Sequence, residues 1–392
     1  MRYHNQLGKK PLAHILITLA WLTLQPHCLR ADAPSQTTMP KRPAPAVTLF
    51  VATGGNDSNP GTHERPFATL ERARDEIRKL KQRGPLPKGG IVVAISGGCY
   101  QVTKTFTLAA EDSGTAAAPI VYRAGGEEMP IFSGGLRLKD FKPVTDTAIL
   151  KRLPEEARGK VVQVDLAAHG LKNIKPLILG GFSSGRGFIT HPLKELFFEG
   201  RALPLARWPN EGFARIENVE LDGHSIHGRS GRKTGRFTYQ GDRPQRWKED
   251  KDAMLYGYWF WGWADSYEPV ESIDTKRREI TLKPPYHKYG YRKGQPYHAI
   301  NLLSEIDRPG EWYIDRDTSL LYLYPPSDPN KAVVMLSTFD HPFVEMKNVS
   351  HVSFERLVWE FGCGDAVHII GGEHCLLAGC TIRHCGGNAV TI

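Results

Sequence analysis

The sequence lacks the signatures that would assign it to several common functional classes. It contains no H-E-x-x-H motif and no phosphate-binding P-loop, which argues against a zincin peptidase and a P-loop nucleotidase. The acidic turn DRDTS lacks the spacing and the distal glutamate of an EF-hand calcium loop. Charges of one sign form no block, so nothing supports a nucleic-acid partner. We therefore predict no metal, no cofactor and no nucleic acid.

Cysteine is scarce, and its spacing is irregular. The chain has six cysteines without regular C-x-x-C pairs, a pattern that fits neither a disulfide scaffold nor a zinc site well. We interpret the last five mainly as small interior residues, with one disulfide bridge as an alternative for two of them. These five are Cys99, Cys363, Cys375, Cys380 and Cys385.

Long hydrophobic runs are also missing. The stretch ILITLAWLTL has only about ten residues, too few to cross a bilayer. Because it follows a basic stretch and precedes the small residues of LRADA, residues 1–31 are predicted to be a secretory signal peptide, with a membrane anchor as the alternative. Its removal lowers the formal net charge from +9 to +5. The mature protein would be secreted, periplasmic or on the cell surface, without a stable membrane span.

A proline-rich linker is predicted over residues 32–46, followed by one helix and short strands over residues 47–135. Gly84 and Pro85 end the helical pattern, and glycine-separated strands such as GIVVAISGGCY and PIVYRAGG come next. We expect an amphipathic N-terminal helix that caps the first strands. Its apolar positions, which begin after Thr69, are Leu70, Ala73, Ile77 and Leu80.

A period of 23 residues organises the end of the chain. VSFERLVWEFGCGDAVHI at residues 352–369 aligns without a gap on CLLAGCTIRHCGGNAVTI at residues 375–392, and FVEM holds part of a third copy. Repeats of this length, broken by glycines, favour a solenoid of the parallel β-helix type. Alternation predicts Val344, Met346, Val367, Ile369, Val390 and Ile392 inside, and Glu345, His368 and Thr391 outside.

Residues 136–334 lack this period. They contain hairpin-like pairs such as EWYIDRDTSLLYLYPP, in which two alternating strands flank a polar turn. We predict an antiparallel β-sandwich domain inserted into the solenoid, whose coils resume over residues 335–392. The predicted fold class is therefore all-β.

Several stretches together resemble the secreted right-handed parallel β-helix proteins of carbohydrate-degrading bacteria. They are FVATGGNDSNPGTHERPFATLERARDEIR, PIVYRAGG, LARWPNEGF, GYWFWGWADSYEPV, GEWYIDRDTSLLYLYPP and the terminal coils. In particular, the chain resembles β-helical glycoside hydrolases with an inserted β-sandwich, a group with β-xylosidase-like and α-fucosidase-like members. The resemblance spans nearly the whole mature chain. It implies a hydrolase whose catalytic carboxylates lie on the coil face, partly in coils that this chain lacks.

Glycoside hydrolysis requires two carboxyl groups, about 5 Å apart for retention and about 6.5–9.5 Å apart for inversion. Coils stack at roughly 4.8 Å, so carboxylates one or two periods apart would suit these mechanisms. No aligned column contains two carboxylates: the relevant pairs are Asp365 with Asn388, Glu360 with Arg383, and Glu345 with His368. Asp365, in the glycine-rich bend GCGDAV, is the candidate catalytic residue. The alternative is a ladder of Asp365 and Asn388 that satisfies turn backbone groups.

Further candidates are predicted to contact substrate. His368 and Arg383 should face outward, with a solvated histidine and a surface ion pair of Arg383 with Glu360 as the alternatives. On a strand, the tryptophans of YGYWFWGWAD share one face, which suits the apolar faces of sugar rings. The sugar platform would comprise Trp261, Trp263 and Asp265; a sandwich core is the alternative for the tryptophans.

Three functions remain open from the sequence. The leading hypothesis is a secreted glycoside hydrolase acting on plant or algal polysaccharide or oligosaccharide, and the alternatives are a polysaccharide lyase and a noncatalytic glycan-binding or surface-adhesion module. The last coil, HCGGNAVTI, would expose unpaired backbone groups. We therefore expect a fragment whose missing coils carry the second carboxylate, or self-association through this edge.

Overall fold

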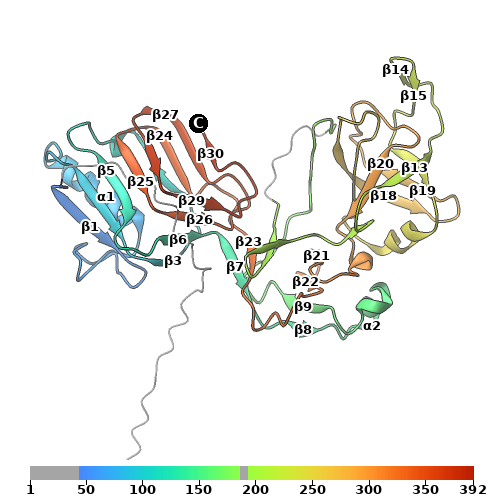
Figure 1. The fold of residues 1–392 in the computed structure, drawn as a ribbon, viewed down its shortest axis with the longest axis horizontal. Helices are drawn as coiled ribbons and strands as arrows, with labels where there is room; N and C mark the ends of the chain where they lie inside the picture. The colour runs from blue at the N-terminus through green and yellow to red at the C-terminus, as the bar shows by residue number, and fades with distance from the viewer. Residues whose placement is uncertain (1–43, 186–192) are drawn as a thin grey trace, which may run out of the picture.

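The computed structural model describes residues 44–185 and 193–392, so the predicted signal peptide and most of the linker lie outside the described residues. Short strands dominate and helices are few, as expected for an all-β chain. Parallel sheets occupy one side of the molecule and antiparallel sheets the other (Figure 1). Two stretches that are far apart in the sequence, residues 47–133 and 344–391, contribute strands to the same parallel sheets.

Three sheets are parallel, and successive strands of the chain join successive sheets. Sheet A has the order β1 (Val47–Val51), β2 (Ile91–Ile95), β5 (Ile120–Ala124), β25 (Val352–Glu355) and β28 (Leu376–Ala378). Sheet B has the order β29 (Thr381–Arg383), β26 (Val358–Glu360), β6 (Pro130–Ser133) and β3 (Gly98–Gln101). Sheet C has the order β30 (Val390–Thr391), β27 (Val367–Glu373), β24 (Val344–Ser350) and β4 (Phe106–Leu108).

The strand register of these sheets follows the 23-residue period. Val344 pairs with Val367, and Val367 with Val390, while β25 with β28 and β26 with β29 show the same offset. Val344 and Val367 lie in one apolar core with residues of all three sheets, as predicted. Val390 and Ile392 do not: they are 36% and 96% exposed, because β30 is the edge strand of sheet C among the described residues.

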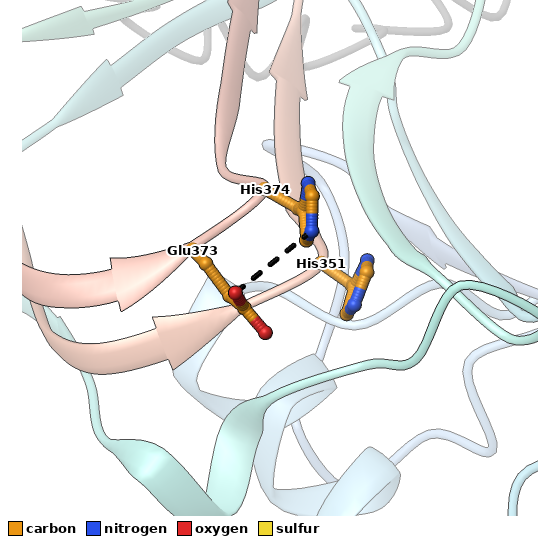
Figure 2. A group of neighbouring side chains, drawn as sticks. All are labelled: His351, Glu373 and His374. Carbon is orange, nitrogen blue, oxygen red and sulfur yellow. Dashed lines mark ion pairs between the residues drawn. The ribbon is translucent and has the colours of Figure 1, made fainter.

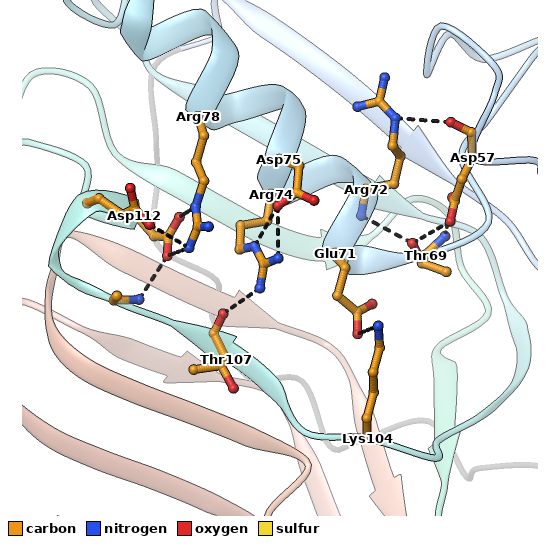
Figure 3. A network of polar contacts seen from close by, with 12 residues as sticks. Asp57, Thr69, Glu71, Arg72, Arg74, Asp75, Arg78, Lys104, Thr107 and Asp112 are labelled. Carbon is orange, nitrogen blue, oxygen red and sulfur yellow. Dashed lines mark hydrogen bonds and ion pairs between the residues drawn. The ribbon is translucent and has the colours of Figure 1, made fainter.

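Helix α1 (Leu70–Gln82) begins and ends where the sequence predicts. Its apolar face enters the core of the parallel sheets through Leu70, Ala73 and Ile77. Thr69 is the N-cap: its hydroxyl accepts the Arg72 N–H at 3.1 Å and donates to Asp57 at 2.8 Å. The polar face of α1 also contacts the rest of the protein. Arg78 donates two hydrogen bonds of 2.7 Å to the buried carboxylate of Asp112 (Figure 3).

Two small antiparallel sheets follow the parallel part. Sheet D has the order β11 (Arg201–Leu203), β10 (Leu196–Phe198), β23 (Val334–Ser337) and β7 (Gly135–Leu138). Sheet E has the order β21 (Trp312–Asp315), β22 (Leu320–Leu323), β9 (Val162–Asp165) and β8 (Lys142–Pro143), and the short helix α2 (Thr147–Arg152) lies near it (Figure 1). The predicted hairpin in EWYIDRDTSLLYLYPP is the β21–β22 pair.

The rest of the insertion closes on itself instead of forming the predicted sandwich. Neighbouring strands pair around a complete antiparallel ring of β20 (Pro296–Ile300), β13 (Ala214–Asn218), β16 (Arg236–Tyr239), β19 (Glu279–Leu282), β18 (Ser266–Asp274) and β17 (Met254–Gly257), which pairs back with β20. β12 (Arg207–Trp208) adds to β20, and β14 (Ser225–Ile226) and β15 (Arg229–Ser230) form a separate hairpin.

Large side chains explain the closed ring. Its interior contains Phe237, Trp247, Trp259 and Tyr297, all at most 1% exposed. A ring of few strands has an interior just wide enough for side chains to fill, and closure leaves fewer unpaired edges than two open sheets would. The predicted β-sandwich is therefore replaced by a filled antiparallel barrel together with the two smaller sheets.

Candidate functional site

The turn between sheet B and sheet C carries Asp365. Asp365 lies between β26 and β27. It is at the same end of sheet B as the point where the insertion begins, directly after β6. One carboxylate oxygen, Oδ1, accepts the Asn388 N–H at 2.7 Å; the other, Oδ2, lies 2.9 Å from His368 Nε2 and accepts the Thr391 hydroxyl at 2.9 Å. Asp365 thus holds the turn of the next 23-residue repeat and contacts a histidine at the same time.

Asp365 is poised to remain ionised. Its side chain is one quarter exposed. Burial raises the pKa of its carboxyl group, but the hydrogen bonds from His368, Asn388 and Thr391 together outweigh burial and lower that pKa below its ordinary value. A partly exposed carboxylate with this environment is suited to act as a base, a nucleophile or a stabiliser of positive charge.

Glu360 and Arg383 form an ion pair, but not on an open surface as predicted. Arg383 Nε donates to Glu360 Oε2 at 2.8 Å, and the side chain of Glu360 is fully buried. The insertion covers this part of sheet B: Phe197 of β10 packs on Phe361 with ring centroids 5.0 Å apart, and on His384 at 4.9 Å. Burial raises the pKa of Glu360, and Arg383 counters that rise. Arg383 therefore neutralises a buried carboxylate.

Glu195 is a residue that sequence reasoning missed. It directly precedes β10, and its backbone N–H donates to the hydroxyl of Ser337 at 2.8 Å, while the thiol of Cys363 lies 3.5 Å from the same oxygen. Burial raises the pKa of Glu195. Its charge in turn helps to raise the pKa of Cys363 and Cys385, the cysteines that flank the Asp365 turn. No local pattern around Glu195 signalled this position, because only the packing of the insertion on sheet B creates it.

A cavity of about 410 Å³ lies near the turn that carries Asp365. It lies where Thr338 and Asp340, in the connection from β23 to β24, face Lys194 and a mainly apolar loop of the insertion. Phe339 of that connection bridges to Gly362, which places the cavity beside the turn that carries Asp365. A volume of this size is typical of small-molecule sites. The other lining residues are Leu171, Asn173, Ile174, Lys175, Pro176, Leu177, Ile178, Leu179, Leu193, Leu205, Trp312, Ile314 and Arg316.

The aromatic stretch YGYWFWGWAD forms no flat strand face. Strand β17 ends at Gly257 and β18 begins at Ser266, so the tryptophans occupy the connecting loop. Trp259 is buried in the barrel, whereas Trp261 packs beneath the guanidinium group of Arg229 at 5.1 Å, and Trp263 lies against Phe182 and Tyr289. The predicted flat strand face with Trp261, Trp263 and Asp265 is therefore not formed, because these residues lie in a loop; their contact with a sugar stays a prediction.

Asp265 instead joins another aromatic cluster. Its Oδ2 accepts the hydroxyl of Tyr256 at 3.0 Å, and Tyr256 contacts Tyr258, Tyr267 and His298 with ring centroids 4.8–5.7 Å apart. Phe213, which is 45% exposed, covers Tyr258 and His298 at 6.2 and 5.4 Å. The stretches LARWPNEGF and GYWFWGWAD therefore both contribute to one partly exposed aromatic surface. We call this surface the Phe213 cluster; it consists of Phe213, Tyr256, Tyr258, Tyr267 and His298.

The four cysteines near the end of the chain are free thiols. Cys363 is buried, and the other three are half-buried and pack on the core of the parallel sheets. Burial raises the pKa of all four thiols. They therefore have the small interior role predicted for them, and a raised pKa disfavours the reactive thiolate form.

Comparison with known structures reveals a related fold. A solved structure named "Glycoside hydrolase" matches with a TM-score of 0.61 and 20% sequence identity, over 81% of this chain and 51% of that chain. "The complex structure of XylC with xylose" matches with a TM-score of 0.39 and 13% identity, over 84% of this chain and 40% of that chain. The chain spans about half the length of these proteins or less. No family model and no curated protein matches the sequence.

The match to the first of these structures shows that this chain shares its all-β fold. A third solved structure, "Rhamnogalacturonan lyase", overlaps only 22% of each chain, with a TM-score of 0.18 and 30% identity. Within residues 44–185 and 193–392, every helix is too short or too polar to pass through a bilayer.

Proposed function

We propose that this chain belongs to a secreted glycoside hydrolase whose three parallel sheets form the faces of a right-handed parallel β-helix. Its substrate would be a plant or algal polysaccharide or oligosaccharide bound over the turns between sheets B and C, next to the insertion. The observation that carries the proposal is the partly exposed carboxylate of Asp365, which His368 and Thr391 contact at 2.9 Å, together with the carboxyl group of Glu195, which acts on the neighbouring Cys363. Asp365 has a lowered pKa, whereas Glu195 has a raised one.

Such a contrast suits the division of labour in glycoside hydrolysis. A carboxyl group with a raised pKa can protonate the leaving glycosidic oxygen, and an ionised carboxylate can attack the anomeric carbon or activate water. In this proposal Glu195 is the proton donor and Asp365 the nucleophile or base, with His368 positioning the Asp365 carboxylate. Similarity to the solved glycoside hydrolase supports this proposal at the level of fold.

The test is incubation of the full chain with plant and algal glycans, followed by chromatography of the products. We expect released sugars with the wild type, and a loss of at least a hundredfold in rate with Asp365→Asn and with Glu195→Gln. The exposed Glu156→Gln provides a matched control that should retain full activity. Absence of released sugar would refute hydrolysis, and products with unsaturated, ultraviolet-absorbing ends would identify a lyase instead.

A noncatalytic glycan-binding module is a second candidate, favoured by the partly exposed Phe213 cluster. Aromatic faces with nearby hydroxyl and carboxylate groups suit pyranose rings. If binding without turnover is the function, Phe213→Ala and Tyr258→Ala should weaken glycan binding in affinity electrophoresis. Leu221→Ala, a change at a 62% exposed apolar residue outside the cluster, should not.

A further inference from the structure

Another cluster of functional groups lies at the opposite end of sheet C from Asp365. His351 follows β24, and Glu373 and His374 lie at the end of β27, where the chain passes from sheet C to sheet A (Figure 2). Strand β27, of 7 residues, runs from the Asp365 turn to this cluster, so the two lie at opposite ends of the strand. It is therefore not part of the candidate site for glycan hydrolysis.

Coil stacking places the two histidines together. They are one 23-residue period apart, and both have φ of +55°, so the same left-handed backbone conformation projects both imidazoles in the same direction. The rings stack with centroids 4.7 Å apart and an angle of 20° (Figure 2). The backbone is anchored as well: the His351 N–H donates to Glu373 O at 3.1 Å, and the Glu373 N–H donates to the Ser350 hydroxyl at 3.2 Å.

The three side chains can converge on one point. One ligand atom of each, an imidazole nitrogen or a carboxylate oxygen, lies within 4.8 Å of the others, and His374 Nε2 is 3.9 Å from Glu373 Oε2. A tetrahedral ion with bonds of about 2.0–2.1 Å holds its ligand atoms roughly 3.3 Å apart. Glu373 and His374 are exposed and His351 is half-exposed, so side-chain rotation can bring the atoms inward without moving the coils.

The chemistry of this set selects a class of ion. Two imidazoles and one carboxylate are the protein ligands of many zinc sites with an open fourth position, and imidazole also suits Cu²⁺ and Ni²⁺. Ca²⁺ and Mg²⁺ prefer all-oxygen ligands. We propose that His351, Glu373 and His374 bind one divalent transition-metal ion such as Zn²⁺, with water completing the coordination. The ion would clamp two successive coils at the passage from sheet C to sheet A, independently of the proposed hydrolase function.

The first test is calorimetric titration of Zn²⁺ into the untagged full chain after treatment with a chelator. We expect one bound ion per chain with micromolar affinity, and an affinity at least tenfold weaker for His351→Ala and for His374→Ala. His63→Ala is the matched control, because His63 forms a similar exposed pair with Glu64, 3.8 Å apart. Absence of binding, or equal affinity in all four proteins, would overturn the proposal.

A spectroscopic readout separates ligation from a mere effect on folding. The electron paramagnetic resonance spectrum of the Cu²⁺-loaded protein should show coupling to two imidazole nitrogens, and to one in either histidine variant. Glu373→Gln should weaken binding while keeping both nitrogen couplings. Zn²⁺ should raise the melting temperature of the wild type but not of the histidine variants, whose metal-free melting temperatures should equal that of the wild type. A nitrogen coupling pattern unchanged by both histidine substitutions would refute the site.

Discussion

Glu311 shows at the scale of a single residue how the fold changes the chemistry of a side chain. It is 3% exposed, and its Oε2 accepts the backbone N–H groups of Asp307 at 2.9 Å and Arg308 at 3.1 Å. Burial raises the pKa of Glu311 to about 7, although these hydrogen bonds oppose the rise. The folded protein therefore takes up a proton between about pH 4.5 and 7 that the unfolded chain releases.

This proton uptake predicts a specific pH dependence. Since the folded state binds the proton more tightly, the free energy of unfolding should fall as pH rises from about 4.5 to 7, and the contribution should be constant above the folded pKa. Glu311→Gln removes the titrating group but keeps an acceptor, so the decline over this range should become shallower. Urea unfolding at several pH values measures how the free energy of unfolding changes with pH, with Glu156→Gln as the control. If the free energy of unfolding of Glu311→Gln depends on pH as steeply as that of the wild type, Glu311 is not the titrating group.

The buried pair of Glu360 and Arg383 carries a second residue-scale prediction. Arg383→Ala leaves a fully buried carboxylate without the guanidinium group that compensates it, so we expect a loss of about 3–5 kcal/mol in unfolding free energy. Adding Glu360→Gln to Arg383→Ala should recover part of this loss, because the stranded charge is gone. Chemical denaturation of the two variants tests the idea, and equal stabilities would count against a buried charge as the cause.

At the scale of elements, helix α1 was predictable from the sequence and the barrel was not. The apolar spacing after Thr69 and the stop at Gly84 are local signals, and the helix runs from Leu70 to Gln82. Closure of β17 onto β20 joins segments some 40 residues apart, and it depends on how Trp259 and Tyr297 fill one interior. Alternation within strands is the same for a sandwich and for a barrel, so it does not distinguish them.

The N-cap of α1 provides an element-scale prediction. The Thr69 hydroxyl accepts the Arg72 N–H and donates to Asp57, so Thr69→Ala should lower the free energy of unfolding by about 1–2 kcal/mol. Thr69→Ser retains the hydroxyl and should recover most of the stability. Denaturation curves of both variants provide the measurement, and equal destabilisation by alanine and serine would refute the capping role.

At the scale of the whole molecule, the parallel sheets and the barrel have separate cores. Phe354 is fully buried in the core shared by sheets A, B and C and α1, whereas Trp259 is fully buried in the barrel. Sheet D lies next to the parallel sheets: its strand β7 follows β6 of sheet B, and its strand β23 leads into β24 of sheet C (Figure 1). Separate cores joined by small sheets favour unfolding in more than one step.

Calorimetry should resolve this organisation. Phe354→Ala should lower the melting temperature of one transition and Trp259→Ala that of another, each costing about 3–5 kcal/mol, so that each variant is the control for the other. If both substitutions shift one common transition by the same amount, the two cores unfold as a single cooperative unit.

Features that repeat or depend on local contacts could be predicted from the amino-acid sequence alone. The 23-residue period set the register of Val344 with Val367 and of Asp365 with Asn388, because each copy of the repeat pairs with the next copy. Packing in three dimensions determines which segments cover these repeats and which side chains from distant segments come into contact. Phe197 buries the region of Glu360, and the turn of the chain separates Trp261 from Trp263. Such contacts join distant segments, and their geometry depends on packing that no local pattern encodes.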